Sequence, residues 1–99
     1  MNDAENFAFR KILDLISSFQ DKSTSVEDLM SALEIYSSSV DWGDRAMEGV
    51  LFGYSNRIDL VTHTFNSDLI FYKVNALMDE LKGSEVFLRY LRSVREIDF

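Results

Sequence analysis

Apolar residues recur every three or four positions along almost the whole chain, and no proline interrupts them. This spacing places the apolar residues on one face of an α-helix, whereas a half-buried strand needs strict alternation. Proline inside such a segment would end or kink the helix, and the four glycines of the chain are few for the turns of a sheet protein. The sequence therefore predicts an all-α fold, a compact antiparallel bundle of four to five helices.

The size and composition of the chain favour one domain with one core. Of its 99 residues, 46% are hydrophobic and 13% are aromatic, which is too apolar for an intrinsically disordered chain. We expect residues 1–99 to form a single helical domain. The absence of cysteine excludes disulfides and thiolate metal ligands, and we expect neither a cofactor nor a metal site.

Polar breaks divide the chain into five segments, each with an apolar stripe. Thr24 or Ser25 can begin the second helix with a capping box, and Gly83 after Lys82 is expected to end the fourth. We expect the stripe of each segment to face a common core. The expected helices span residues 4–20, 26 to about 37, 41–63, 68–82 and a last segment that begins near residue 84.

Three local features lead to further expectations. Phe7 and Phe9 are candidates for the core, and residues 37–39, three serines, are expected to form the loop after the second helix. Gly49 and Gly53 lie four residues apart on a helical pattern. This spacing indicates close helix packing in a soluble bundle, or a slightly weakened helix.

The central segment, residues 41–63, carries the only tryptophan of the chain, Trp42, at its acidic start. Asp41 or Asp44 can cap the helix that follows. Two interpretations of Trp42 stay open. It covers the edge of the core, or it is a partly exposed anchor of a protein interface, ringed by carboxylates.

Charge is the clearest functional signal in the sequence. The net charge is −7, and six acidic residues with a single base, Arg45, lie between positions 27 and 48. Such a surface attracts basic proteins and repels nucleic acid and anionic lipid, or it serves only solubility. We expect a basic protein partner, with no nucleic acid and no membrane. No apolar run could span a bilayer, and the acidic start MNDAENF is unlike a signal peptide, so we expect a cytoplasmic location.

Catalytic patterns are missing from the sequence. It contains no glycine-rich phosphate loop, no cysteine nucleophile and no Gly-x-Ser-x-Gly elbow, so we do not expect an enzyme. His63, the only histidine, is expected at the surface without a functional role. Arg89, Arg92 and Arg95 recur every three residues, and we expect them to pair with acidic residues of the chain itself.

Three stretches carry a resemblance to a known family. ILDLISSFQDKSTSVEDLM (12–30) indicates a helix, a short Lys/Ser turn and an acidic helix start, and GVLFGYSNRID (49–59) and DLIFYKVNALMDELK (68–82) indicate later helices. In this pattern, over about two thirds of its length, the chain resembles the small, acidic, helical immunity proteins that neutralise bacterial toxins. The likeness is to immunity proteins of the colicin D and contact-dependent growth inhibition type.

The resemblance implies a helical bundle that plugs the basic active-site cleft of a toxin nuclease, such as an RNase or tRNase, with carboxylates. A nuclease cleft must be cationic to hold phosphates, so an acidic helical surface can occupy it and associate fast through electrostatic steering. The rival hypothesis is an acidic adaptor or a nucleic-acid mimic that inhibits a host or phage-defence enzyme. The candidate partner-binding residues are Asp41, Trp42, Asp44, Glu48, Tyr54 and Asp59.

Overall fold

The computed structural model describes residues 2–97, with side chains as far as Val94, and all regular structure in this part of the chain is helical. The predicted all-α class is confirmed, and each expected helix is present within a few residues of its expected bounds. The five helices are α1 (Asp3–Gln20), α2 (Val26–Ser39), α3 (Arg45–Thr64), α4 (Ser67–Lys82) and α5 (Glu85–Ile97).

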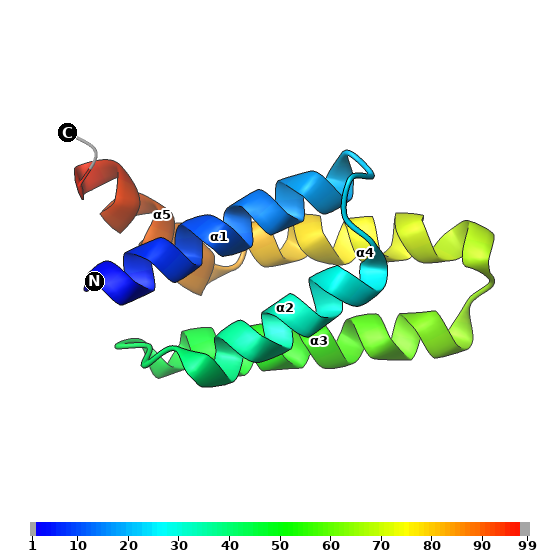
Figure 1. Ribbon diagram of the computed structural model, residues 1–99, viewed down its shortest axis with the longest axis horizontal. Helices are drawn as coiled ribbons and strands as arrows, with labels where there is room; N and C mark the ends of the chain where they lie inside the picture. The colour runs from blue at the N-terminus through cyan, green and yellow to red at the C-terminus, as the bar shows by residue number, and fades with distance from the viewer. Residues whose placement is uncertain (1, 98–99) are drawn as a thin grey trace.

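Four helices form an antiparallel bundle, and the fifth closes one end of it (Figure 1). α2 lies alongside α3, α3 contacts α4, and α1 contacts both α2 and α4. α1 and α2 lie close together at their connecting loop and diverge towards the opposite end of the bundle. At that end α5 meets the start of α1 and the segment 40–44, which joins α2 to α3. Three segments that are distant in the sequence therefore come together there.

The core receives side chains from every helix, at the spacing that the sequence predicts. Phe9 of α1 contacts the rings of Phe87 and Tyr90, with ring centroids 5.2 and 5.4 Å apart, so aromatic packing holds α5 to the bundle. The fully buried side chains include Phe9, Ile12, Ile16, Leu29, Leu33, Met47, Leu51, Ile58, Val74, Met78, Leu81 and Phe87.

Three of the local predictions are wrong, and the first two concern Phe7 and residues 37–39. Phe7 is 62% exposed, whereas Phe9 is fully buried. Residues two apart lie about 200° apart around a helix, so only one of the two rings can face the core. Residues 37–39 continue α2 instead of forming a loop. The hydroxyl groups of Ser37 and Ser38 donate to the carbonyl oxygen of Glu34, which satisfies these serines inside the helix.

The glycines of α3 are not at a close helix contact. A Cβ atom added to Gly49 or Gly53 would meet no other atom within 4 Å. The expected close packing inside the bundle is therefore wrong, because both positions face open space on the outward side of α3. Each glycine in a helix interior is about 1 kcal/mol less favourable than alanine, and nothing inside the bundle offsets this loss.

Candidate partner-binding surface

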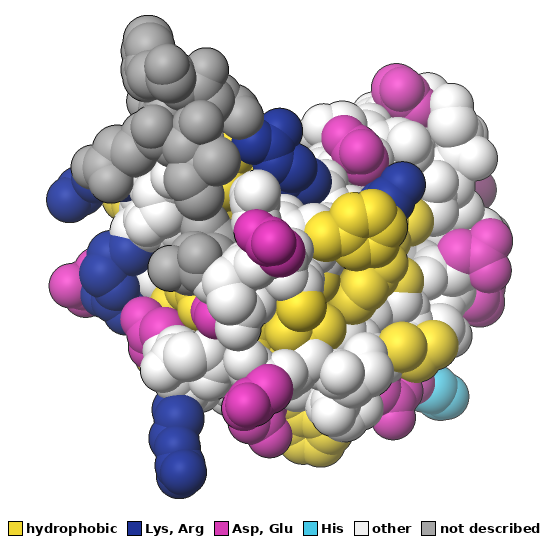
Figure 2. All heavy atoms as spheres, turned by 60° about the vertical axis from the view of Figure 1, so that its left-hand side comes forward, with side chains coloured by type: hydrophobic (Ala, Val, Ile, Leu, Met, Phe, Trp, Pro, Cys, Tyr) yellow, Lys and Arg dark blue, Asp and Glu magenta, His cyan; other side chains and the backbone are white. Residues whose placement is uncertain are grey.

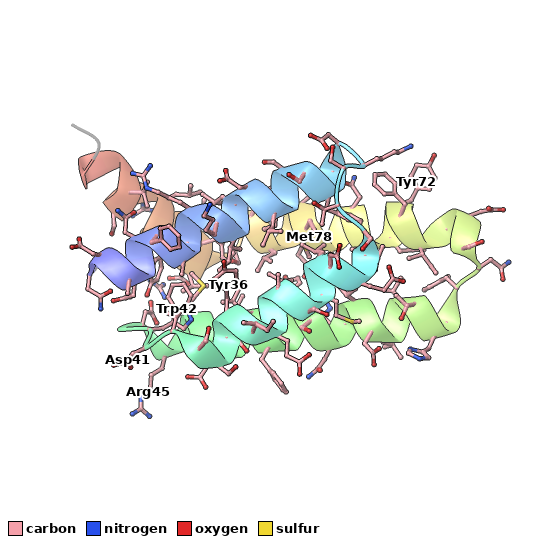
Figure 3. The ribbon with its side chains drawn as sticks, viewed as in Figure 1. Tyr36, Asp41, Trp42, Arg45, Tyr72 and Met78 are labelled. Atoms are coloured by element: carbon pink, nitrogen blue, oxygen red, sulfur yellow. The ribbon has the colours of Figure 1, made fainter. Side chains whose placement is uncertain are left out.

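Trp42 fixes the segment between α2 and α3 to the core. The residue is only 5% exposed, and its indole Nε1 donates to the carbonyl oxygen of Tyr36 at 2.9 Å. The ring meets the edge of Tyr90, with centroids 5.6 Å apart. Trp42 therefore covers the edge of the core, and the alternative of a partly exposed ring is wrong. Figure 3 shows Asp41 of this segment and Arg45 at the start of α3 on the outside of the bundle.

Asp44 is used inside the fold. One carboxylate oxygen accepts from the backbone N–H of Ala46 at 3.0 Å and caps α3, as the sequence predicts. The other accepts from Nη2 and Nε of Arg89 at 2.7 and 3.2 Å. The hydrogen bonds from Arg89, followed by the bond from Ala46, lower the pKa of Asp44 below its ordinary value. Its charge is thus largely compensated before any partner arrives.

The expected internal pairing of the α5 arginines is confirmed for Arg89, which also lies 3.3 Å from Glu85. The Arg95 side chain lies outside the part of the chain whose side chains the structure describes. The pairing of Arg89 with Asp44 ties α5 to the start of α3. This ion pair is partly solvated, so its main effect is to orient the two elements.

Glu5 is a buried carboxylate that the sequence analysis missed. Its Oε2 accepts from the hydroxyl of Tyr90 at 2.7 Å and from the backbone N–H of Gly43 at 3.1 Å. The backbone N–H of Asn2 donates to its Oε1 at 3.4 Å. Burial opposes the ionisation of Glu5, but these hydrogen bonds together outweigh it and lower the pKa of Glu5. Glu5 therefore joins α1, the segment 40–44 and α5.

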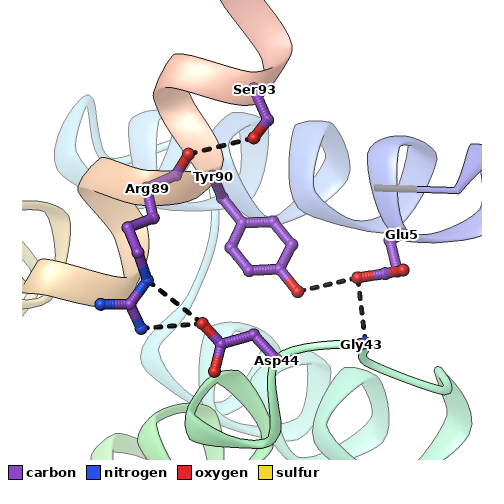
Figure 4. Close-up of a pocket in the computed structure, with 6 residues that line it drawn as sticks. All are labelled: Glu5, Gly43, Asp44, Arg89, Tyr90 and Ser93. Carbon is purple, nitrogen blue, oxygen red and sulfur yellow. Dashed lines mark hydrogen bonds and ion pairs between the residues drawn. The ribbon is translucent and has the colours of Figure 1, made fainter.

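A pocket of about 300 Å³ lies where these segments meet (Figure 4). Its polar groups are bonded to one another, and the described part of the chain contains no buried side-chain polar atom without a partner. Burial, and then the hydrogen bond to Glu5, raise the pKa of Tyr90 well above its ordinary value, so its hydroxyl stays a donor. These contacts stabilise the fold. The lining residues are Glu5, Gly43, Asp44, Arg89, Tyr90 and Ser93.

Asp41, Glu48 and Asp59 are exposed, as a partner-binding role requires. Asp41 and Glu48 have no ion pair among the described side chains, and Asp59 lies 3.4 Å from Nδ1 of His63. Glu48 and Asp59 are three helical turns apart, on the same side of α3 and about 16 Å apart along its axis. The structure therefore leaves Asp41 and Glu48 free for a partner, in contrast to Asp44, whereas Asp59 is exposed beside His63.

Tyr54 lies apart from the other candidate residues. It is six residues from Glu48, which places it about 120° away around α3, on the side of α4. The guanidinium of Arg57 lies 4.8 Å from its ring centre and pairs with Glu80 at 3.0 Å. Burial, and then the hydrogen bond to Glu80, raise the pKa of Tyr54. Tyr54 thus belongs to the contact between α3 and α4.

The outward side of α2 is acidic. Glu27, Asp28 and Glu34 are exposed there, and α2 contains neither lysine nor arginine. With Asp41, which follows α2, they form what we call the acidic surface, and none of the four has an ion pair within the described residues. Ile35 of α2 is 59% exposed. Figure 2 shows hydrophobic side chains in the middle of one face, with Asp and Glu side chains around them.

The described residues show no group of three or more His, Cys, Asp or Glu side chains that could hold a metal ion. His63 is exposed, as expected, and its Nδ1 lies 2.8 Å from the carbonyl oxygen of Asp59. None of the helices in this part of the chain has the length and the apolar character needed to cross a membrane.

No family model, no curated protein and no solved structure matches this chain. Its function is therefore inferred from the position and charge of the described residues. Two sets of carboxylates differ in availability. Glu5 and Asp44 are bonded inside the fold, whereas the acidic surface is free to meet a partner.

Proposed function

We propose that this protein is an immunity protein that binds and neutralises a cognate bacterial nuclease toxin, an RNase or tRNase. It does so by covering the basic active-site cleft of the toxin with an acidic helical surface. One observation carries the proposal. The carboxylates of the acidic surface, Glu27, Asp28, Glu34 and Asp41, are exposed, are held on a rigid helix and its C-terminal continuation, and lack internal partners.

Electrostatics makes this surface suitable for a nuclease cleft. A cleft that holds phosphates must present lysine and arginine, and a fixed array of carboxylates can take the place of the phosphates. Long-range attraction between the two surfaces raises the association rate, while like-charged nucleic acid is repelled. Because the four carboxylates do not pair internally, binding breaks no ion pair of the free protein.

The buried Trp42 supports the surface instead of contacting the partner with an exposed ring. Its hydrogen bond to Tyr36 and its contact with Tyr90 hold the chain on both sides of it in place. Asp41, the preceding residue, is thereby presented at a fixed position next to the end of α2. A preformed surface loses little conformational entropy when it binds, which favours high affinity.

Apolar contacts are also available beside the carboxylates. Ile35 of α2 follows Glu34 in the sequence and is 59% exposed. Interface affinity usually comes from a few well-packed apolar or aromatic side chains, while the charges around them set the association rate and the specificity. The acidic surface therefore has both components that a tight protein inhibitor needs.

The experiment that tests the function is co-expression with a toxin. A candidate toxin nuclease domain from a neighbouring gene is produced in cells with and without this protein. We expect the protein to restore growth, to co-purify with the nuclease domain, and to inhibit RNA cleavage by that domain at equimolar amount. Growth arrest and RNA cleavage that persist despite abundant folded protein would contradict the proposal. Binding to a host or phage enzyme instead would favour the acidic-mimic alternative.

A further inference from the structure

Two apolar side chains, Phe52 and Leu60, are exposed on the outward side of α3. Phe52 is 51% exposed and Leu60 is 66% exposed. They lie eight residues apart, so they are about two turns apart along the helix. The outward side of α3 is covered by no other helix of the described chain.

The residues around Phe52 form an open hole. Gly49, Phe52, Gly53 and Asn56 occupy positions i, i+3, i+4 and i+7, the four positions that form a hole in knobs-into-holes packing. A Cβ at either glycine would meet nothing within 4 Å, so the floor of the hole is bare backbone that faces solvent. No contact inside the bundle requires glycine at these two positions.

We propose that two copies of this chain pair in antiparallel orientation through α3, with Leu60 of each copy inserted into the hole of the other. The knob and the hole lie on the same helix, which makes the surface complementary to itself. The centre of the hole is near position 52 and the knob is at position 60, so a two-fold axis beside Asn56 forms both contacts at once. No different partner protein is needed, because each copy supplies both the knob and the hole.

The polar residues of α3 fit the same register. At the axis Asn56 meets the partner's Asn56, and two amides can donate to and accept from each other. In this register Glu48 comes to lie opposite the partner's Thr64, and Asp59 opposite the partner's Gly53, which has no side chain. Like charges on α3 are thus not placed directly against one another, which a net charge of −7 on each copy makes necessary.

This pairing is independent of the proposed immunity function. Its contacts come from the outward side of α3, whereas the acidic surface belongs to α2 and Asp41. Glu48 and Asp59 lie at the rim of the paired helices in this arrangement. The dimer therefore leaves Glu27, Asp28, Glu34 and Asp41 open to a nuclease.

Cysteine cross-linking tests the register directly, because the chain has no cysteine of its own. In Asn56→Cys the only thiol of each copy lies at the axis, and mild oxidation is expected to give a disulfide-linked dimer. Ser31→Cys, at an exposed position on α2, is the matched control and is expected to stay monomeric. An Asn56→Cys variant that does not cross-link, or that cross-links no better than the control, would overturn the proposal.

Sedimentation equilibrium of the unmodified protein provides the second test. The mass is expected to approach twice that of the monomer as the concentration rises. Leu60→Asp is expected to raise the dissociation constant about tenfold or more, while Leu69→Asp, at an exposed position on α4, leaves it unchanged. Wild-type protein that remains monomeric at every concentration, or an equal effect of the two variants, excludes the pairing.

Gly53→Leu separates the effect on pairing from the effect on the fold. Leucine forms helices better than glycine, and this position faces open space, so the melting temperature of the monomer is expected to rise. The same side chain fills the hole, so the dimer is expected to weaken. A rise in both stability and association would contradict the proposed contact.

Discussion

Asp41 and Asp44 lie three residues apart between α2 and α3, and their surroundings are opposite. Asp44 caps α3, accepts from Arg89 and has a lowered pKa. Asp41 is exposed and has no ion pair among the described side chains. Trp42, which points into the core between them, separates the two environments. A net charge of −7 therefore does not tell which carboxylates a partner can reach.

The same division applies to the rest of the molecule. Glu5 and Asp44 are inner carboxylates that join α1, the segment 40–44 and α5. Glu34 and Asp41 belong to the acidic surface, and their carboxylates bind no other described residue. If the division is right, replacing an inner group changes stability, and replacing an outer group changes partner binding alone.

Trp42→Ala is expected to have the largest effect on stability. It removes a buried ring, its contact with Tyr90 and the donor to the Tyr36 carbonyl oxygen, so the free energy of unfolding should fall by about 3–5 kcal/mol. Urea unfolding followed by circular dichroism measures this change without the tryptophan signal. Tyr72→Ala, at a ring that is 65% exposed, should stay within about 0.5 kcal/mol of wild type. Equal losses in the two variants would contradict the structural role of Trp42.

Glu5→Ala is expected to have the next largest effect. It leaves the hydroxyl of Tyr90 and the N–H of Gly43 without their acceptor, which should lower the free energy of unfolding by about 1–3 kcal/mol. Asp3→Ala removes the same charge from the same helical turn, at an exposed position, and is expected to cost less. Urea unfolding of both variants gives the comparison, and a greater loss for Asp3→Ala would show that Glu5 is not an inner carboxylate.

The dependence of stability on pH should also show that Glu5 is an inner carboxylate. The pKa of Glu5 in the folded protein lies below its ordinary value of 4.5, so its contribution to stability is complete above that pH. The contribution is lost as the pH falls through the lower, folded pKa. Urea unfolding at a series of pH values should therefore show stability that declines below about pH 4.5, with a shallower decline in Glu5→Gln. An identical acid decline in that variant would contradict the lowered pKa of Glu5.

The smallest expected effect on stability separates Asp44 from Asp41. Asp44→Ala removes the N-cap of α3 and should lower the free energy of unfolding by about 1 kcal/mol. Asp41→Ala should leave it within about 0.5 kcal/mol of wild type. Thermal and urea unfolding of the two variants are compared side by side. If Asp41→Ala were the less stable variant, the assignment of inner and outer groups would be reversed.

Local periodicity made the bundle predictable from the sequence. The five helices and their buried faces follow from the apolar stripes, because one face of each helix must be removed from water. The Asp44 cap follows from short-range backbone chemistry. α4 also ends before Gly83 as predicted, although Gly83 does not adopt the left-handed conformation that favours glycine. The exposure of Asp41 and Glu48 also agrees with what charged residues on helix surfaces usually do.

Contacts between distant residues could not be predicted in this way. Glu5 and Tyr90 are 85 positions apart, and the first-turn position of Glu5 is already explained by its capping box with Asn2. The orientation of Trp42 depends on the carbonyl oxygen of Tyr36, which no pattern around the tryptophan reveals. The spacing of Gly49 and Gly53 indicates a close contact with another helix but does not identify that helix.

The most direct test of the central claim is the association rate with a candidate toxin nuclease domain from a neighbouring gene, measured at low and high salt. Glu34→Gln/Asp41→Asn should lower the rate at low salt by about tenfold and leave the fold intact. Asp14→Asn/Asp68→Asn removes the same charge from exposed, unpaired positions on α1 and α4 and should keep a rate near that of wild type. An equal decrease in the two double variants, or no decrease in the first, would contradict the claim that the acidic surface binds the toxin.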